Sequence, residues 1–241
     1  MNKRVLLEAE SIAVERERII NEYSRREIEI ADDLYALWQP GQSLILAERR
    51  RKAALLLHQG GVFPTSEDQC LEIGYGRLGW LGELISWGVK ESNIHGIELD
   101  ASRAEKAKSI LPIADLRIGD AVDLPWEDNK FKLVIVSTVF SSILNSRIRE
   151  LIAAEITRVL ALNGTLLWYD IAVNNPNNKN IAKISSRDLR DLFPLLKGQI
   201  VTVTLAPPIA RKVAPVSWLL ASFLESIPFL HTHLLAVLKK N

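Results

Sequence analysis

Cysteine is almost absent from this sequence: Cys70 is the only one among 241 residues. A lone cysteine excludes a disulfide bond within the chain and fits a reducing compartment, in which we expect Cys70 to behave as a small buried hydrophobe. Histidine is also scarce. His231 and His233 lie on one side of an extended segment, but no cysteine or further histidine cluster accompanies them, so we predict no metal site.

An excess of either charge is also missing, because the formal net charge is only +1. Proteins that bind nucleic acid generally need a concentrated basic face to contact phosphates, so the composition argues against a nucleic-acid partner. One basic cluster stands out, Arg49-Arg50-Arg51-Lys52. We interpret it as the solvated face of a helix that continues into an apolar stretch, with a phosphate site as the less favoured alternative.

Long uninterrupted apolar runs are lacking as well. Acidic residues already occur within residues 1–10, where a signal peptide would have its apolar stretch. Export is therefore not predicted, and we expect a cytoplasmic protein. Residues 213–230 are strongly apolar, but Pro215, Glu225 and Pro228 interrupt them, whereas a membrane-spanning helix needs about 20 mostly apolar residues. We predict a packed helix there and no stable membrane insertion, while peripheral contact with a membrane or an apolar substrate stays open.

The most informative feature that is present is a glycine turn. Residues 70–80 read Cys-Leu-Glu-Ile-Gly-Tyr-Gly-Arg-Leu-Gly-Trp, an apolar strand followed by glycines 74, 76 and 79 at the start of a helix. Glu98 ends the next apolar run, at the distance where a carboxylate commonly holds ribose hydroxyls. The pattern predicts a nucleotide-type cofactor, although the same spacing fits a dinucleotide fingerprint, and a purely structural turn is also possible.

Glu72 favours one cofactor over another. A pyrophosphate at a helix N-terminus requires amide donors and positive potential, which a carboxylate two residues before the first glycine opposes. S-adenosylmethionine has no phosphate and carries an ammonium and a sulfonium, which an acidic residue at this strand end favours. The methyl donor therefore fits the motif better than a dinucleotide.

Two further segments agree with this interpretation. Gly119-Asp120-Ala121 follows the strand-like stretch 115–118, and Asp120 there can accept a hydrogen bond from an adenine amino group. An Asx turn explains the same residue equally well. Residues 131–136 then form a short apolar run typical of a buried parallel strand, which ends at Ser137.

Taken together, these motifs resemble the class I S-adenosylmethionine-dependent methyltransferases, in particular the type 11 methyltransferase domain family. The resemblance rests on the segments 71–76, 96–100, 119–125, 131–136 and 158–164, and it covers roughly residues 65–170 in family order. One position departs from the family pattern. The third glycine, Gly79, comes one residue later than usual, and Leu78 stands in its place.

The resemblance implies roles for individual residues along the cofactor. Glu72, Gly74 and Gly76 would line the methionine end, and Glu98 would hold the ribose hydroxyls. Leu99 would pack on the adenine, Asp120 and Ala121 would contact its edge, and Ser137 would lie beside the methionine portion. Leu99 and Ser137 are equally well explained as an ordinary core residue and an ordinary strand end. Tyr23, with Arg26 near the cofactor carboxylate, would cap the methionine end, or would simply be the inward residue of an amphipathic helix.

Periodicity and turn residues predict an α/β fold. Strand-like runs at 69–73, 93–98, 115–118, 131–136 and 164–170 alternate with helical stretches near 79–88, 101–110 and 147–161. Residues 200–205 and 233–238 add two strands, and helices are expected at about 5–36 and 43–58. The resemblance implies a Rossmann-like seven-stranded sheet, mostly parallel with its last strand antiparallel and with helices on both faces. We divide the chain into an N-terminal helical cap or lid, 1–62, and an S-adenosylmethionine-binding methyltransferase domain, 63–241.

Candidates for the acceptor half come from loops that follow the strands, where ligands of open parallel sheets bind. Asp170 is a candidate base, Asn174 or Asn175 a candidate to orient the acceptor, and Arg211 a candidate contact for an anionic group. Asn and Pro also make turns for their own reasons, and Arg211 needs no role as a surface residue. His231 near a loop is a second candidate base, while His233 is expected in the core and His58 and His95 are expected to be structural.

These observations predict an enzyme that moves a methyl group from S-adenosylmethionine to an oxygen or nitrogen of a small molecule. The segments 168–178, 204–211 and 232–239 also look like a bacterial subgroup associated with surface-glycan or secondary-metabolite pathways, which implies a sugar or metabolite as acceptor. Two alternatives stay open: an NAD-dependent oxidoreductase, and a non-catalytic module that binds S-adenosylmethionine. The sequence does not specify the acceptor or the oligomeric state.

Overall fold

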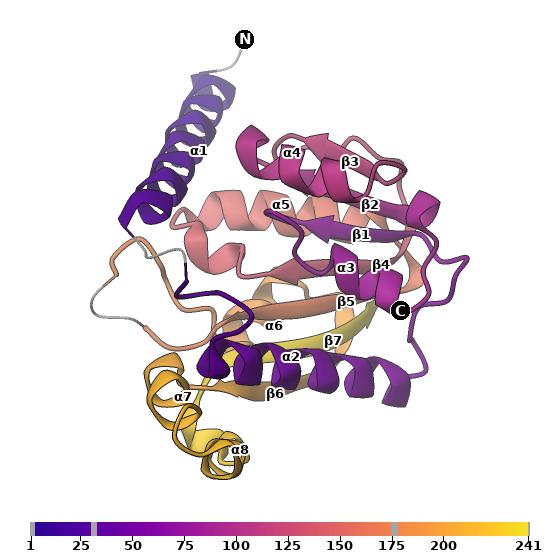
Figure 1. Ribbon diagram of the computed structural model, residues 1–241. Helices are drawn as coiled ribbons and strands as arrows, with labels where there is room; N and C mark the ends of the chain where they lie inside the picture. The colour runs from indigo at the N-terminus through magenta and orange to yellow at the C-terminus, as the bar shows by residue number, and fades with distance from the viewer. Residues whose placement is uncertain (1–2, 30–32, 175–177, 241) are drawn as a thin grey trace.

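The computed structural model describes residues 3–29, 33–174 and 178–240. Its centre is one seven-stranded sheet with the strand order β3-β2-β1-β4-β5-β7-β6 (Figure 1). Six strands run in the same direction, and β7 is antiparallel to both of its neighbours, so the sheet is mixed. The strands are β1 (Cys70–Ile73), β2 (Ile94–Glu98), β3 (Asp115–Ile118), β4 (Phe131–Ser137), β5 (Leu160–Ile171), β6 (Leu196–Leu205) and β7 (His231–Lys240).

Helices cover both faces of the sheet, as expected for strands that are apolar on both sides. On one face lie α2 (Pro40–Gln59), α3 (Leu81–Ser86) and α4 (Ala101–Ile110), whose buried residues share a core with Cys70, Leu133 and Leu235. On the other face α5 (Ser146–Val159) and α6 (Ser186–Leu192) pack against the opposite side chains of the same strands. Three single turns of 3₁₀ helix, η1 (Glu91–Asn93), η2 (Phe140–Ser142) and η3 (Pro228–Leu230), lie in the connections.

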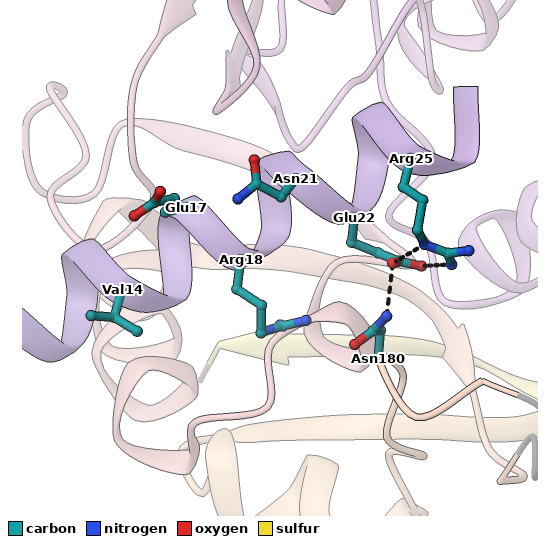
Figure 2. Close-up of a pocket in the computed structure, with 7 residues that line it drawn as sticks. All are labelled: Val14, Glu17, Arg18, Asn21, Glu22, Arg25 and Asn180. Atoms are coloured by element: carbon teal, nitrogen blue, oxygen red, sulfur yellow. Dashed lines mark hydrogen bonds and ion pairs between the residues drawn. The ribbon is translucent and has the colours of Figure 1, made fainter. Parts of the chain in front are cut away.

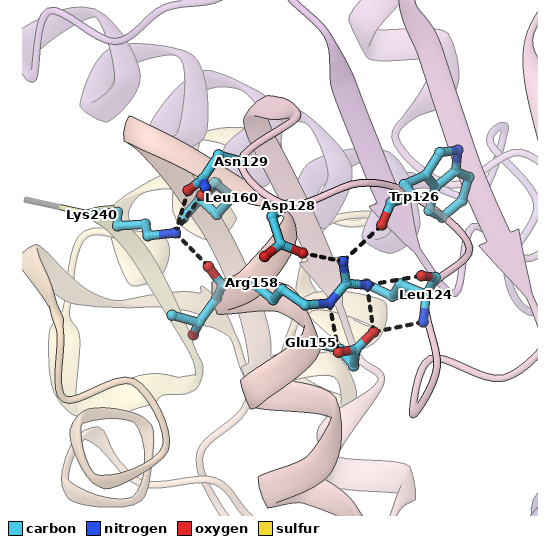
Figure 3. A network of polar contacts seen from close by, with 9 residues as sticks. Leu124, Trp126, Asp128, Asn129, Glu155, Arg158, Leu160 and Lys240 are labelled. Carbon is cyan, nitrogen blue, oxygen red and sulfur yellow. Dashed lines mark hydrogen bonds and ion pairs between the residues drawn. The ribbon is translucent and has the colours of Figure 1, made fainter.

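Polar contacts stabilise the end of the sheet that lies opposite the carboxyl ends of the parallel strands. The Arg158 guanidinium pairs with Glu155 and Asp128 and also donates to two carbonyl oxygens of the β3–β4 connection (Figure 3). Lys240, at the end of β7, donates to Asn129 and to the carbonyl oxygens of Thr157 and Leu160. The two cations therefore tie α5, β7 and the β3–β4 connection together.

Helix α1 (Lys3–Glu29) stands apart from the sheet, beside the carboxyl ends of the strands (Figure 1). Ile12 and Ile19 of α1 pack against the hydrophobic core, and polar contacts hold the helix as well. Glu15 accepts hydrogen bonds from the backbone of Leu144 and Asn145, and Arg18 donates to the carbonyl oxygen of Ser142. Helix α2 packs directly on the sheet through Ala53 and Leu57, and its first half also reaches this edge. The division of the chain at residue 62 stays a prediction.

The apolar segment 213–230 is not the packed helix that we expected. It contains the end of α7 (Pro207–Val213), the short helix α8 (Trp218–Glu225) and η3, which project from one corner of the molecule (Figure 1). Small residues such as Ala214 and Ala221 face inward, while Leu219 is 83% exposed and Phe229 is 90% exposed. In the described part of the chain, no helix combines the length and apolar character needed to cross a bilayer.

The predicted α/β architecture is confirmed in its main features: seven strands, helices on both faces, and one antiparallel strand. The elements differ from the sequence prediction mostly at their ends. β5 begins at Leu160, in a stretch that we expected to be helical, and β6 begins at Leu196 instead of residue 200. Helical and strand periodicity are hard to distinguish over such short apolar stretches.

Candidate functional site

A crevice of about 1070 Å³ opens at the carboxyl ends of the parallel strands. Its walls come from the ends of β1, β2, β4 and β5, from η2, from α1 and α2, and from α7 with the start of β7. Ligands of open α/β sheets bind at this edge, so the location agrees with the one expected from the fold. The volume is slightly above the range of about 300–1,000 Å³ that is usual for one small ligand.

The glycine turn after β1 is shaped by left-handed backbone at Gly74 and Gly76, with φ angles of 71° and 58°. A side chain at Gly74 would overlap Val139, and one at Gly76 would overlap the Arg103 guanidinium. Glu98 anchors the turn, since its carboxylate accepts the Gly76 amide at 2.7 Å and the Asp100 amide at 3.0 Å. Gly74 and Glu98 line the crevice, whereas Gly76 lies just outside its lining.

Glu72 does not line the crevice. It is buried beneath the turn, where its carboxylate accepts the Trp80 amide at 2.8 Å and its other oxygen has no partner among the described residues. Gly79 packs against this carboxyl group: a Cβ at position 79 would lie 2.7 Å from the carboxyl carbon. The displaced third glycine of the motif thus accommodates a buried acid, and Glu72 supports the turn from below.

Burial raises the pKa of Glu72 to about 8, although the Trp80 amide and the nearby Arg49 lower it. Because the ordinary pKa of 4.5 applies to the unfolded chain, folding is favoured most when Glu72 is protonated. This contribution to stability is fully present below about pH 4.5 and is lost as the pH rises through about 8.

We therefore expect Glu72→Gln to be more stable than the wild type at pH 8.5 and to show a flatter dependence of stability on pH. Urea unfolding at pH 5 and pH 8.5 measures both effects, with the exposed Glu67→Gln as the matched control. A variant whose stability falls between these pH values as steeply as the wild type would contradict the buried, protonated state.

The residues expected around the adenine lie in the crevice together with Ser137, which was expected beside the methionine portion. Leu99, Asp120, Ala121 and Ser137 all line the crevice. Asp120 forms an ion pair of 2.8 Å with Arg16 of α1, and its other carboxylate oxygen accepts the Val122 amide. The Asp120 carboxylate therefore makes the turn contact expected of an Asx turn and is also partly exposed at the crevice.

Tyr23 and Arg26 bring α1 into the same crevice. The Arg103 guanidinium lies over the Tyr23 ring at 4.4 Å from its centre, and the Tyr23 hydroxyl is 3.4 Å from that of Ser142. Arg26 donates to the Tyr35 hydroxyl at 3.4 Å. The sequence placed Tyr23 near the methionine end, and the structure places it opposite the glycine turn and Arg103.

Arg49 is a site residue that the sequence did not reveal. We expected the basic run 49–52 to be solvated, but the Arg49 side chain turns inward and lines the crevice. Its guanidinium lies 4.5 Å over the Trp80 ring and 5.4 Å over the Tyr169 ring, and its buried Nε has no hydrogen-bond partner in the described part of the chain. Burial lowers the pKa of Arg49, while Tyr169 and Glu72 raise it, so a cation is held at this end of the crevice.

Two candidate bases lie away from the crevice. Asp170 is fully buried and accepts the amides of Ser141 and Ile171, and burial raises its pKa to about 6. It fixes η2 against the end of β5 and has no access to an acceptor. Both ring nitrogens of His231 are occupied, one by the Glu225 carbonyl oxygen and one by the Thr202 hydroxyl. Neither residue lines the crevice, contrary to what we expected of a base.

His233, which we expected in the core, does line the crevice. Its ring stacks on Tyr169 with centres 4.8 Å apart, and burial lowers its pKa to about 4. Thr232 donates its hydroxyl to the Thr204 carbonyl oxygen, so its oxygen is free to accept Nδ1–H of His233 at 2.9 Å. That arrangement leaves Nε2 of a neutral imidazole as an acceptor, without a partner among the described residues.

The three acceptor candidates have different outcomes. Asn174 and Arg211 both line the crevice, while Asn175 lies outside the described residues.

A second hollow of about 430 Å³ lies on α1 near Asn180, where the Glu22 carboxylate accepts hydrogen bonds from Arg25 and Asn180 (Figure 2). It contains none of the predicted site residues and shows that α1 is also held by the segment after β5. No group of three or more potential metal ligands occurs in the described part of the chain.

Comparison with known proteins agrees with this geometry. Residues 71–168 match the family model described as "Methyltransferase domain". A solved structure named as a candidate sarcosine dimethylglycine methyltransferase from Galdieria sulphuraria is similar with a TM-score of 0.59 and 15% identity, over 80% of this chain and 85% of that one. No curated protein matches the chain.

Geranyl diphosphate C-methyltransferase from Streptomyces coelicolor A3(2) is similar to this chain as well. Its complex with Mg²⁺, geranyl-S-thiolodiphosphate and S-adenosyl-L-homocysteine has a TM-score of 0.58 and 16% identity, over 79% of this chain and 76% of that one. At such identities the structures show a shared fold. The family match adds that residues 71–168 are similar to a methyltransferase domain, and two of the similar structures were solved with S-adenosylmethionine or S-adenosyl-L-homocysteine bound.

The residues of the crevice fit that cofactor. The turn at Gly74 leaves room for close backbone approach, and Glu98 and Asp120 present carboxylates where hydroxyl and amino donors are expected. Arg49, with an unpartnered buried Nε, supplies a cation for a carboxylate. These features match the polar groups of S-adenosylmethionine.

Proposed function

We propose that this chain uses its methyltransferase domain to move a methyl group from S-adenosylmethionine to an oxygen or nitrogen of a small molecule. The single observation that supports this most is the crevice itself, in which predicted cofactor residues and additional acceptor-side residues line one continuous space. The match of residues 71–168 to a methyltransferase domain supports the methyl donor over the dinucleotide interpretation of the glycine turn.

We assign the cofactor to the half of the crevice formed by β1, β2 and β4. Glu98 would hold the ribose hydroxyls, Asp120 would accept from the adenine amino group, and Arg49 would pair with the methionine carboxylate. Leu99 and Ala121 would provide apolar contact with the adenine. The Arg16–Asp120 ion pair would have to share or exchange its contact when the adenine binds, because both partners use the same carboxylate.

S-adenosylmethionine supplies a methyl group that is already activated by a sulfonium leaving group. The protein then has to orient the acceptor, exclude water and remove a proton where the attacking atom carries one. Helix α1 suits the role of a lid, because its Tyr23 and Arg26 face the strand ends across the crevice. We propose that closure by α1 shields the reacting groups from solvent.

We propose His233, instead of Asp170 or His231, as the proton acceptor. His233 lines the crevice, its contact with Thr232 leaves Nε2 as the acceptor, and its low pKa keeps the imidazole neutral throughout the physiological range. His233→Phe retains a ring that can stack on Tyr169 and removes the acceptor. We expect kcat to fall by about 10²- to 10⁴-fold with unchanged binding of S-adenosylhomocysteine.

Wild-type kcat should be constant from about pH 6 to 8 and fall as the pH approaches 4, where His233 becomes protonated. Steady-state kinetics over this range test the assignment, with the exposed His58→Phe on α2 as the control. Equal kcat values for His233→Phe and the wild type would show that the reaction needs no base at this position.

The function itself is tested with radiolabelled S-adenosylmethionine and fractions of small metabolites, separated into amines, alcohols and carboxylic acids. Mass spectrometry of the labelled product then identifies the acceptor by a gain of one methylene unit. Formation of S-adenosylhomocysteine together with a labelled small molecule supports the proposal. Tight cofactor binding without transfer to any fraction favours the non-catalytic alternative, and absence of cofactor binding contradicts both.

A further inference from the structure

The crevice contains more positive charge than its cofactor requires. Seven arginines line it: Arg16, Arg25, Arg26, Arg49, Arg77, Arg103 and Arg211. Four acidic residues line it as well: Glu15, Glu27, Glu98 and Asp120. All four acids already have partners, because three are paired with arginines and Glu98 accepts two backbone amides.

Three of the seven arginines are neutralised by carboxylates. Arg16 pairs with Asp120, Arg77 pairs with Glu27, and Arg25 pairs with Glu22 and Glu29. The other four have no carboxylate partner within 4.0 Å among the described residues: Arg26, Arg49, Arg103 and Arg211. Buried or half-buried guanidinium groups are normally paired with an anion. Four such groups without a carboxylate partner around one cavity therefore indicate that the cavity binds anionic ligands.

Two of these four belong to the cofactor half. Arg49 lies by Trp80 and Tyr169, near the buried Glu72, and Arg103 lies beside Gly76 and over Tyr23. S-adenosylmethionine carries one carboxylate, so one of these cations suffices for it. Arg26 and Arg211 remain, and they lie at the other end, by α7 and the segment that contains Tyr35.

Arg26 and Arg211 converge on one residue. The Arg26 guanidinium donates to the Tyr35 hydroxyl at 3.4 Å, and the Arg211 guanidinium lies 5.7 Å from the centre of the Tyr35 ring. The Arg211 Nε is buried and has no hydrogen-bond partner among the described residues. Its backbone is held in place, because Gly41 of α2 approaches so closely that a Cβ there would lie 2.7 Å from the Arg211 Cα.

On this basis we propose that Arg211 and Arg26, with the Tyr35 hydroxyl, form an anion site that binds a carboxylate or phosphate group of the methyl acceptor. Two guanidinium groups and a hydroxyl provide the forked donors that such groups accept. The surrounding lining residues Ile45, Pro207 and Pro208 are apolar, which would strengthen the attraction by excluding water. This inference rests on the proposed function and narrows its acceptor to an anionic small molecule.

The test measures anion binding separately from methyl transfer. The full chain, saturated with S-adenosylhomocysteine so that the cofactor half is filled, is titrated by calorimetry with inorganic phosphate, pyrophosphate and succinate. We expect one site, weakened by added sodium chloride, and at least tenfold weaker binding by Arg211→Gln. Arg26→Gln and Tyr35→Phe should weaken it less. Arg187→Gln, at a 91% exposed side chain on α6, is the matched control and should bind like the wild type.

The titrations with phosphates and with succinate distinguish the two sources of negative charge, since a site for phosphate should prefer pyrophosphate over the dicarboxylate. Binding of no probe by the wild type, or equal binding by Arg211→Gln and the wild type, overturns the inference. A second set of titrations without S-adenosylhomocysteine covers the case in which that ligand does not bind. Failure of S-adenosylhomocysteine to bind would contradict the proposed function. The anion site would still be supported if the wild type bound the anions and Arg211→Gln did not.

Discussion

Gly79→Ala should lower the free energy of unfolding by about 2–5 kcal/mol, a large change for a single methyl group. Two costs add at this position. An alanine in left-handed backbone, here at a φ of 52°, costs about 1–2 kcal/mol. Its Cβ would also overlap the buried Glu72 carboxyl group, and forcing extra atoms into a packed interior costs about 1–3 kcal/mol.

Gly61→Ala separates these two costs. Gly61 has a similar φ of 64°, but an added Cβ would have no atom within 4 Å, so only the backbone cost applies. We expect a loss of about 1 kcal/mol for that variant, measured by urea unfolding under the same conditions. A second variant, Gly79→Ala combined with Glu72→Ala, should recover part of the loss. Equal losses for Gly79→Ala and Gly61→Ala would show that the contact with Glu72 has no energetic weight.

Glu98→Ala should weaken the binding of S-adenosylmethionine and of S-adenosylhomocysteine by at least about 100-fold. The carboxylate is the proposed partner of both ribose hydroxyls, and each hydrogen bond to a charged group is worth about 1.5–3 kcal/mol. It also holds the Gly76 and Asp100 amides, so the glycine turn loses its anchor at the same time. Calorimetric titration with each compound measures the effect.

Two further variants separate ligand contact from support of the turn. Glu98→Gln retains an oxygen that can accept one backbone amide, so it should fold like the wild type and lose an intermediate amount of affinity. Glu105→Ala, at an exposed carboxylate of α4, should bind both compounds normally. Wild-type affinity in Glu98→Ala would contradict the assignment of this residue to the ribose.

The sequence was sufficient to predict the parallel strands and most of the side of the crevice that we assign to the cofactor. Those residues follow short apolar strands directly, and the strand ends of a parallel sheet must meet at one edge. Leu99, Asp120, Ala121 and Ser137 were located in this way, and all four line the crevice. Glu72 was placed at the right turn but on the wrong side of it, because the spacing does not tell which strand-end side chain points into the core.

Residues on helices and at the antiparallel end of the sheet were harder to place. Arg49 belongs to a run of four basic residues, and helical periodicity alone did not distinguish its inward position from the outward position of Arg50. Asp170, which we expected at the site, is buried away from the crevice, while His233, which we expected in the core, lines it. In the pairing of β5 with β7, Asp170 lies beside Leu234 and Ile171 lies beside His233, so one residue along the strand decides which side chain reaches the crevice.

The apolar corner formed by α8 and η3 has a practical consequence for the purified protein. Molecules in solution stay dispersed through mutual electrostatic repulsion, and a formal net charge of +1 with an isoelectric point near 7.8 provides little of it. An exposed apolar surface on a protein with little net charge favours aggregation. Buffers well below pH 7.8 should keep concentrated samples clear for longer, and replacing Leu219 and Phe229 by lysine should do the same at neutral pH.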